Sequence, residues 1–391
     1  MKPYYSRTIL TIFTFLSLSA SLRAQQEYDI TKRIFLMGRV MPILVSMSGI
    51  SGEAAQVIQF DLYVQGFAFT NADNAQYLIS GNSNGNLVGR VTDKFSKEVK
   101  VSKSYTGGAI RQQAHAFVDD FVKALNGIPI AQTRIVFKND TGKNSELMLA
   151  DFDGHNRSEI TKDNSIVAAP SWVPGKFAVY YTSYKLDHPD VFSHDLGTGA
   201  RKIIARHGGS NLSPAVSPDG SKVAMILSKD GWTDLYVANA DGSSPQRLTK
   251  SREDESSPCW SPDGKWICFA AKIKERRSLC KISPAGGEIQ RIPTSGVLNP
   301  TEPDWSPDGK WIVFTSQMGG FEICVVPSQG GTATQLVAGE DPSWAPNSRT
   351  VIFARRQGGG TRVLSLLDAP TKQVKDISRI SGSNSQPSWA K

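Results

Sequence analysis

The chain has 391 residues, with 44 Lys and Arg against 36 Asp and Glu, and a formal net charge of +8 at pH 7. This length allows two or three domains and a sizeable core. The basic excess is spread along the chain without the dense basic stripe typical of nucleic-acid binding, so we expect no nucleic-acid partner.

The first 24 residues have the three-part pattern of a secretory signal peptide. Lys2 and Arg7 give a positive start, residues 8–22 are uncharged and mostly apolar, and Ala24 offers a small residue for cleavage. The apolar run is shorter than the roughly 20 residues that a membrane-spanning helix needs. We therefore expect an exported mature chain, and the alternative is a retained N-terminal anchor.

Residues 25–130 contain no repeat, and their apolar patterns predict a small α/β domain. Strands are expected at 41–47, 77–79, 87–95 and 99–105, and helices at 52–65 and 109–125. The second helix has the clearer signal because Phe117, Val118 and Phe121 fall in one continuous apolar stripe. Gly127 and Pro129 end it.

From residue 131 onward the chain repeats itself. A Pro-x-Trp motif, a Pro-Asp-Gly turn and a short apolar run recur every 39–45 residues. The anchor positions are Trp172, Val216, Trp260, Trp305, Trp344 and Trp389. Four short strands can be traced in each unit, and this period is typical of propeller blades.

The last repeat stops after its first strand, and its missing strands are found earlier in the chain. Residues 134–137, 146–150 and 159–160 supply a second, third and fourth strand. A C-terminal strand paired with residues 134–137 would close the ring and remove an open sheet edge. The predicted fold class is therefore multidomain, α/β plus all-β: a small N-terminal α/β domain (25–130) followed by a six-bladed β-propeller (131–391).

The search for chemistry finds no convincing catalytic group, cofactor site or metal site. Residues 81–85 match the nucleophile pattern G-x-S-x-G, but Asn84 and Gly85 favour a hairpin turn over the helix that this pattern requires. The five histidines have no metal-binding spacing. We predict no catalytic, cofactor-binding or metal-binding residues.

The cysteines are Cys259, Cys268, Cys280 and Cys324, and their spacing fits no metal motif. Alignment of the blades predicts that Cys268 lies opposite Cys280 on neighbouring strands. An exported chain could oxidise this pair to a disulfide. The alternative is that both are buried free thiols.

The repeat Ser-Pro-x-Trp-Ser-Pro-Asp-Gly resembles that of the TolB family, and so do segments outside the repeat. These segments are residues 103–105, 115–127, 133–135 and 149–156. The resemblance implies a non-enzymatic, periplasmic scaffold of the Tol-Pal system, which maintains outer-membrane integrity and acts in invagination during cell division. It implies that the propeller binds the lipoprotein Pal, and through Pal associates peripherally with the outer membrane.

The same resemblance implies that the mature N-terminus can engage TolA, although residues 25–40 match the family poorly. We expect a monomer without a cofactor. The alternatives are a periplasmic propeller enzyme or the gating domain of a serine-peptidase-like protein, and a sugar- or metal-binding propeller.

The resemblance places Pal at the end of the propeller where the loops lead into the anchor strands. Small hydroxyls, amides and isolated charges gather in these loops. The predicted Pal face comprises Arg206, His207, Ser210, Asn211, Ser213, Glu255, Ser256, Ser257, Asn299, Thr301, Glu302, Glu340, Ser383 and Asn384.

Overall fold

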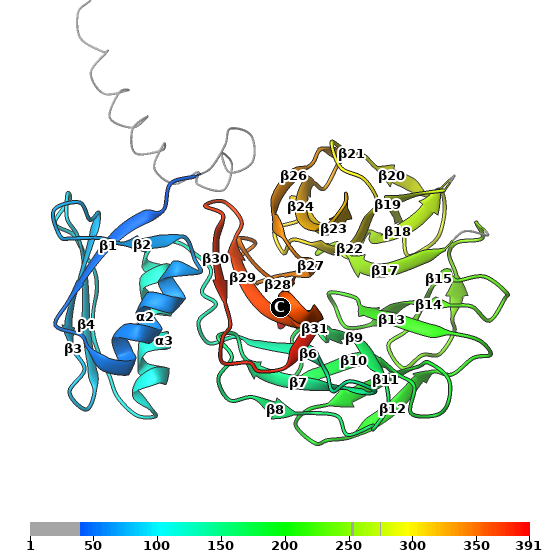
Figure 1. The fold of residues 1–391 in the computed structure, drawn as a ribbon, viewed down its shortest axis with the longest axis horizontal. Helices are drawn as coiled ribbons and strands as arrows, with labels where there is room; N and C mark the ends of the chain where they lie inside the picture. The colour runs from blue at the N-terminus through cyan, green and yellow to red at the C-terminus, as the bar shows by residue number, and fades with distance from the viewer. Residues whose placement is uncertain (1–39, 252–253, 274) are drawn as a thin grey trace, which may run out of the picture. The chain divides into compact units, whose positions relative to one another are not determined.

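The computed structural model describes residues 40–251, 254–273 and 275–391, and residues 41–391 form one compact unit (Figure 1). The predicted signal peptide and the segment proposed for TolA lie outside the described residues. Within the described part of the chain, no helix has the length and apolar character needed to cross a membrane.

The N-terminal part is a five-stranded sheet with two helices on one face (Figure 1). The sheet order is β2-β1-β3-β4-β5, with β1 parallel to β2 and β3 and the rest antiparallel. The elements are β1 (Ile43–Ser48), α2 (Gly52–Tyr63), β2 (Phe67–Phe69), β3 (Tyr77–Asn82), β4 (Leu87–Asp93), β5 (Val99–Tyr105) and α3 (Ile110–Ala124). The predicted helices and strands are confirmed, and β2 is an addition.

Helix α3 packs closely on β4 because the strand presents a glycine to it. A Cβ atom placed on Gly89 would lie 2.5 Å from the ring of Phe117. Leu87 and Val91, two residues on either side, are fully buried on the same face. Buried and exposed residues alternate along β4, and its buried face therefore matches the apolar stripe of α3.

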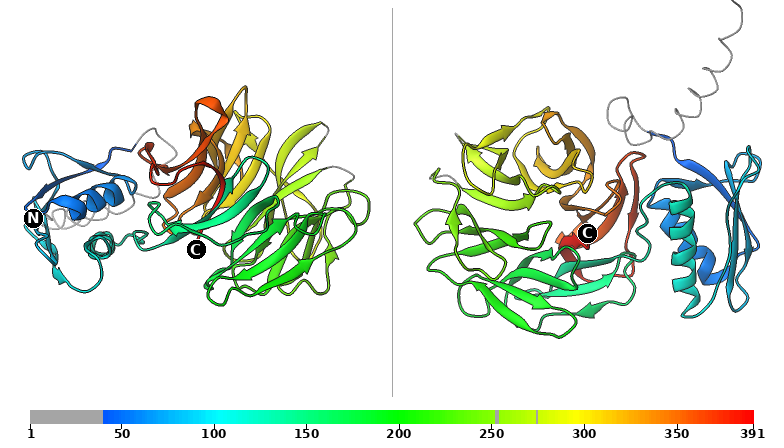
Figure 2. Two further views of the ribbon diagram at one scale, coloured as in Figure 1. Left: turned by 60° about the horizontal axis from the view of Figure 1, so that its bottom comes forward. Right: turned by 180° about the vertical axis from the view of Figure 1, so that it is seen from behind.

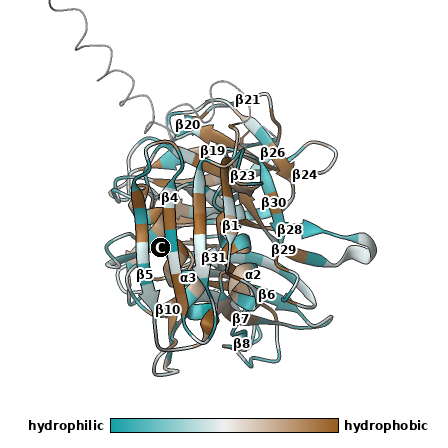
Figure 3. Ribbon diagram, turned by 90° about the vertical axis from the view of Figure 1, so that its left-hand side faces the viewer, coloured by the Kyte–Doolittle hydropathy of each residue, from teal (hydrophilic) through white to brown (hydrophobic). Residues whose placement is uncertain are grey.

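Six four-stranded sheets form the propeller, and the predicted six blades are confirmed (Figure 2). Blade 1 is β9 (Val167–Trp172), β10 (Ala178–Ser183), β11 (Asp190–Asp195) and β12 (Arg201–Ala205); blade 2 is β13 (Asn211–Val216), β14 (Lys222–Leu227), β15 (Asp234–Asn239) and β16 (Gln246–Arg247); blade 3 is β17 (Glu255–Trp260), β18 (Ile267–Ile273), β19 (Arg276–Ile282) and β20 (Gln290–Ile292). Blade 4 is β22 (Pro300–Trp305), β23 (Trp311–Gln317), β24 (Phe321–Pro327) and β26 (Thr334–Ala338); blade 5 is β27 (Glu340–Trp344), β28 (Thr350–Arg356), β29 (Arg362–Asp368) and β30 (Gln373–Asp376). Figure 3, which faces the N-terminal sheet, shows hydrophobic (brown) and hydrophilic (teal) bands along strands such as β4, as expected for a sheet that buries one face.

Blade 6 is built from both ends of the propeller, as predicted. It consists of β31 (Ser383–Trp389), β6 (Arg134–Asp140), β7 (Ser145–Asp151) and β8 (Ser158–Glu159). Ser388 pairs with Val136 and Trp389 with Ile135. The indole N–H of Trp389 also donates to Thr133 Oγ1 at 2.8 Å. The C-terminal strand thus closes the ring.

The Pro-Asp-Gly turns share one hydrogen-bond pattern, which explains why the motif recurs. In the turn of blade 2, Ser217 Oγ donates to Asp219 Oδ1 at 2.6 Å and accepts the backbone N–H of Lys222 at 2.9 Å. Gly220 takes a φ of 69°, in the left-handed region. Hydrogen bonds from Ser217 and Ser221 lower the pKa of Asp219 to about 2. Blades 3 and 4 repeat the Ser–Asp contact at 2.6 Å.

The α/β part and the propeller share one hydrophobic core. Helix residues such as Ile58 and Phe121 belong to the same cluster as Phe152 and Trp389 of blade 6. Two hydrogen bonds reinforce this contact, because Thr350 Oγ1 donates to the carbonyl of Val64 and the amide of Gln373 donates to the carbonyl of Phe67, each at 3.0 Å. The architecture changes from α/β to propeller near residue 130. That residue 130 is also a domain boundary stays a prediction.

The predicted pairing of Cys268 with Cys280 is wrong. Cys280 pairs with Phe269, and Cys268 pairs with Lys281 on one side and Cys259 on the other. The alignment was displaced by one residue, and a one-residue displacement moves a side chain to the other face of the sheet. All four cysteines are free and buried, which agrees with the alternative of core thiols.

Candidate functional site

Each innermost strand of the propeller contains a β-bulge at the residue before its proline. The register of the ladder shifts there in all six blades. These bulge residues have φ between 48° and 56°, in the left-handed region, although none is glycine. The six bulge residues are Ala169, Ser213, Ser257, Glu302, Asp341 and Gln386. A backbone conformation that is costly for one residue is therefore repeated six times around the channel.

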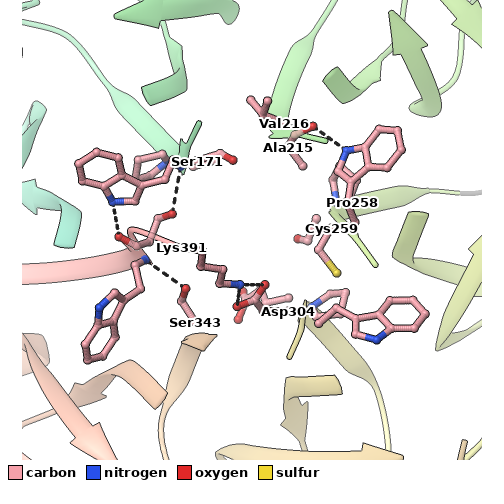
Figure 4. A pocket seen from close by; sticks show the side chains of 18 of the residues that line it. Ser171, Ala215, Val216, Pro258, Cys259, Asp304, Ser343 and Lys391 are labelled. Carbon is pink, nitrogen blue, oxygen red and sulfur yellow. Dashed lines mark hydrogen bonds and ion pairs between the residues drawn. The ribbon is translucent and has the colours of Figure 1, made fainter. Parts of the chain in front are cut away.

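The inner strands surround a cavity of about 380 Å³ at the centre of the propeller (Figure 4). All six bulge residues line it, together with the prolines that follow them. Large indole rings lie farther along the strands, at Trp172, Trp260, Trp305 and Trp389. Two of these rings also join blades: Trp172 Nε1 donates to the carbonyl of Ser388, and Trp260 Nε1 to that of Ala215, each at 2.9 Å. The wall is therefore largely apolar and rigid, with a polar ring at the bulges.

Half of this polar ring is a relay of hydrogen bonds between blades. Glu302 Oε2 accepts the backbone N–H of Asp341 at 3.1 Å, and Asp341 Oδ2 accepts that of Gln386 at 3.0 Å. Gln386 Oε1 then accepts the N–H of Ala169 at 2.9 Å. Burial, together with the neighbouring charge of Glu302, raises the pKa of Asp341 well above its usual value. The bulge side chains thus fasten blades 4, 5, 6 and 1 to one another.

The other half of the ring carries short side chains at the bulges, namely Ala169, Ser213 and Ser257. The backbone N–H of Ser213 donates to Thr182 Oγ1 of the preceding blade at 3.1 Å, so its acceptor is not a bulge side chain. This half of the channel wall is therefore less filled than the half with Glu302 and Gln386.

An ion pair crosses the cavity (Figure 4). Lys391 Nζ lies 2.6 and 2.7 Å from the two carboxylate oxygens of Asp304, which stands on the inner strand of blade 4. Asp304 Oδ2 also accepts the backbone N–H of Trp344 at 2.7 Å. Both charges are partly exposed, so a polar ligand could exchange with either one.

The predicted Pal face divides into groups with different structural surroundings. Ser213, Ser257 and Glu302 come together in the central cavity. Arg206 and Asn299 are exposed, and the following residues are half-buried in the loops or at the strand starts: His207, Ser210, Ser256, Thr301 and Ser383. Contact of these residues with a partner stays a prediction.

The four remaining residues of that face are buried and hold the loops in place. Asn211 donates to the carbonyls of Pro189 and His207, each at 3.1 Å. Glu340 forms ion pairs with Arg356 and Arg362. Glu255 and Asn384 are likewise buried, and Asn384 accepts a hydrogen bond from Asn139 at 2.7 Å.

Sequence reasoning missed several residues of the channel. Asp341 and Gln386 occupy the same place before proline as Ser213, Ser257 and Glu302, so the repeat alignment held the signal for them. The sequence holds no such signal for Asp304 and Lys391, because the two side chains come together only through the curvature of the closed ring.

A second polar cluster lies where the two helices meet blade 6. His115 Nδ1 of α3 lies 2.6 Å from Asp61 Oδ2 of α2, and Arg111 forms an ion pair with Asp153 of the β7–β8 turn. All four side chains are buried. Burial raises the pKa of Asp61 well above its usual value and lowers the pKa of His115 to about 4. The cluster ties both helices to the propeller.

Ser83, in the G-x-S-x-G pattern, serves a hairpin, as predicted. Strands β3 and β4 pair on either side of it, with Asn82 opposite Val88. Its hydroxyl donates to the carbonyl of Ser51 at 3.1 Å and accepts the N–H of Ser51 at 3.2 Å. In the part of the chain that the structure describes, no group of three or more His, Cys, Asp or Glu side chains is placed to hold a metal ion.

Comparison with known proteins gives consistent matches. The family model of the TolB beta propeller domain matches residues 123–391. The Tol-Pal system protein TolB of Anaeromyxobacter dehalogenans is 31% identical over 169 residues, which cover 43% of this chain and 39% of the relative. The Protein TolB homolog of Chlorobaculum tepidum is 33% identical over 163 residues, which cover 41% of this chain and 37% of the relative. The matched region thus spans about two fifths of the length of these curated relatives.

The fold also matches a solved structure. The crystal structure of TolB from Acinetobacter baumannii aligns with a TM-score of 0.81, over 91% of this chain and 98% of that chain. The sequence identity is 20%, so this likeness concerns the fold alone.

Proposed function

Because this chain belongs to the TolB family, we propose that it is a binding scaffold of the Tol-Pal system rather than an enzyme. Its partner is the peptidoglycan-associated lipoprotein Pal, bound where the loops lead into the inner strands. Through Pal the protein would associate with the outer membrane from the periplasm and support membrane integrity and invagination during cell division.

The observation that carries this proposal is the asymmetric channel. All six blades contribute to its wall, but Ala169, Ser213 and Ser257 leave one half with short side chains. A protruding segment of a folded partner can enter such a gap, and the neighbouring loops offer hydroxyls and isolated charges to its rim. An interface with a concave, mainly apolar centre and a polar rim is typical of specific protein recognition.

The test fills the gap with large side chains. We would replace Ser213 and Ser257 together by Arg and measure binding of soluble Pal by calorimetry. Bulge positions of other blades hold Glu302 and Gln386 with the same backbone conformation, so long side chains fit the fold there. We expect binding to weaken at least about tenfold, or ~1.4 kcal/mol, with an unchanged melting temperature.

A matched control replaces Ser244 and Ser378 by Arg. Both are exposed and lie away from the channel wall, and Ser244 also has a positive φ of 54°. This variant should bind Pal as the wild type does. Equal binding by both variants would place Pal elsewhere, and absence of binding by the wild type would refute Pal as the partner.

The cellular role needs its own test. A strain lacking this protein should become sensitive to detergent and divide with delayed outer-membrane invagination, and the protein should fractionate with the periplasm. Complementation by the wild type but not by the S213R/S257R variant would connect the phenotype to the channel. Hydrolysis of peptides by the purified protein would instead favour the enzyme alternative.

A further inference from the structure

A second cavity, of about 370 Å³, opens beside blade 3. Its wall contains three arginines, Arg276, Arg277 and Arg291, together with the hydroxyl-bearing residues Thr294 and Ser295. We call it the arginine pocket. No described residue lines both this pocket and the central channel, so the two cavities are separate.

Two neighbouring strands and one fixed loop bring the arginines together. Arg276 and Arg277 begin β19, and Arg291 lies on β20, which pairs with β19 (Figure 1). After β20 the chain forms β21 (Thr294–Ser295), which pairs in parallel with β25 (Gly331–Thr332).

The loop then turns back at Gly296, with a φ of 91°. The carbonyl of Leu298 accepts hydrogen bonds from Gln317 N at 3.2 Å and Ser316 Oγ at 2.8 Å. Strands β19 and β20 form one wall of the pocket, and the loop that forms the other wall is fixed by its hydrogen bonds to β23.

The positive charges in this pocket have no acidic partner among the described residues. Elsewhere in the propeller, Arg201, Arg349 and Arg355 each pair with an aspartate. In the pocket, the one described acceptor for Arg277 is Ser256 Oγ, at 3.3 Å. No ion pair joins Arg276 or Arg291 to a described carboxylate, and the described lining contains no Asp or Glu. Three like charges in one concave site repel one another, and a bound anion would relieve that repulsion.

The donors define the chemistry of the anion. A guanidinium group offers a planar fork that matches the oxygens of phosphate, and hydroxyls add further hydrogen bonds. Three positive charges suit a phosphate monoester, which carries about −1.5 to −2 at pH 7, better than a single carboxylate. A cavity of this size accommodates a small molecule or a headgroup.

We propose that the arginine pocket binds a phosphate monoester group. This group could belong to a free small molecule or to a lipid headgroup, and the chemistry of recognition is the same. The pocket shares Asn299 with the predicted Pal face, but its three arginines lie outside that face.

The first experiment uses inorganic phosphate as the probe. Titration of the full chain at pH 7 and low salt should show one saturable site, and replacing Arg276 and Arg291 by Ala should weaken it at least about tenfold. The control variant replaces Arg90 and Lys202 by Ala, which removes the same charge from exposed positions outside the pocket. It should keep wild-type affinity. Absence of saturable binding, or equal loss in both variants, would overturn the proposal.

The second experiment separates the two sources. Vesicles of phosphatidylcholine with phosphatidic acid present a phosphate monoester, and vesicles with phosphatidylglycerol present only a diester. A lipid headgroup is indicated if the protein sediments only with the phosphatidic acid vesicles and if this sedimentation requires Arg276 and Arg291. A soluble ligand is indicated if the protein binds phosphate but sediments with neither kind of vesicle. If an oligoglutamate peptide binds the pocket and phosphate does not compete with it, the proposal is wrong. Phosphate binding by the S213R/S257R variant should be unchanged.

Discussion

Asp341 Oδ2 accepts the backbone N–H of Gln386 at 3.0 Å, and this hydrogen bond joins the inner strand of blade 5 to the C-terminal strand of blade 6. Replacing Asp341 by Ala would leave that N–H without its partner at a partly buried junction. We expect the free energy of unfolding to fall by about 1–3 kcal/mol, measured by urea denaturation.

The bulge itself should tolerate the change, because Ala169 has the same backbone conformation in blade 1. Ser257→Ala is the matched control, since it shortens a bulge side chain outside the relay from Glu302 to Ala169. It should change stability by less than about 0.5 kcal/mol. Equal effects of the two substitutions would show that the relay does not hold the blades together.

Ring closure by the C-terminal strand should dominate the stability of the propeller. Deleting residues 386–391 removes Trp389, which is 1% exposed and packs in the shared core. It also exposes the edge of β6. Loss of a buried Trp side chain alone typically costs about 3–5 kcal/mol, so we expect a markedly lower melting temperature by calorimetry.

Lys391→Ala serves as the control for this truncation. It removes only the partly exposed ion pair with Asp304, which should be worth at most about 1 kcal/mol. A truncated chain that melts with the wild type would contradict the role of closure.

The sequence predicts the propeller well because its determinants are local and repeated. The Ser-Pro-Asp-Gly turn makes its own hydrogen bonds, so Ser217 and Asp219 mark a blade without reference to any distant residue. The unfinished last repeat predicts that the C-terminal strand pairs with residues 134–137, and in the structure Trp389 lies opposite Ile135. The short β2 was missed because three residues are too few to establish a period.

The channel was predicted only in part because its contacts depend on the closed ring. Glu302, Asp341 and Gln386 are far apart in the chain and become neighbours only when six bulges meet. Sequence reasoning selected loop residues by polarity, yet polarity alone does not separate Ser257, which lines the cavity, from Asn211, which is buried and bonds its own loop. The partners of a polar side chain are a property of the fold.

Glu255 should make stability depend on pH near neutrality. Burial raises its pKa from 4.5 to about 7, although hydrogen bonds from Ser251 and Thr249 act in the opposite direction. Between these values the folded protein holds a proton that the unfolded chain has released. This contribution to stability is therefore complete below pH 4.5 and is lost as the pH rises through 7.

The test compares the wild type with Glu255→Gln, which has a neutral side chain at every pH. The stability of the wild type relative to this variant should fall by about 2 kcal/mol between pH 5.5 and pH 8. Chemical denaturation at several pH values measures this difference. A difference that is constant with pH would mean that Glu255 is ionised throughout this range.

The cysteines should remain thiols that react only after unfolding. Cys268 packs in a cluster with Cys259 and Cys324, whereas Cys280 belongs to the cluster on the other face of blade 3. Cys268 and Cys280 therefore face away from each other, and no disulfide can join them without disrupting the sheet.

Burial raises the pKa of Cys280 to about 11 and that of Cys324 to about 12, and it also raises the pKa of Cys268. Since only the thiolate is nucleophilic, iodoacetamide at pH 8 should leave the folded protein unmodified.

In denaturant without a reductant, mass spectrometry should find all four cysteines alkylated. If one pair stays protected, Cys259 and Cys268 are the expected partners, because they lie opposite each other on β17 and β18. Protection of Cys268 together with Cys280 would contradict the register of this blade.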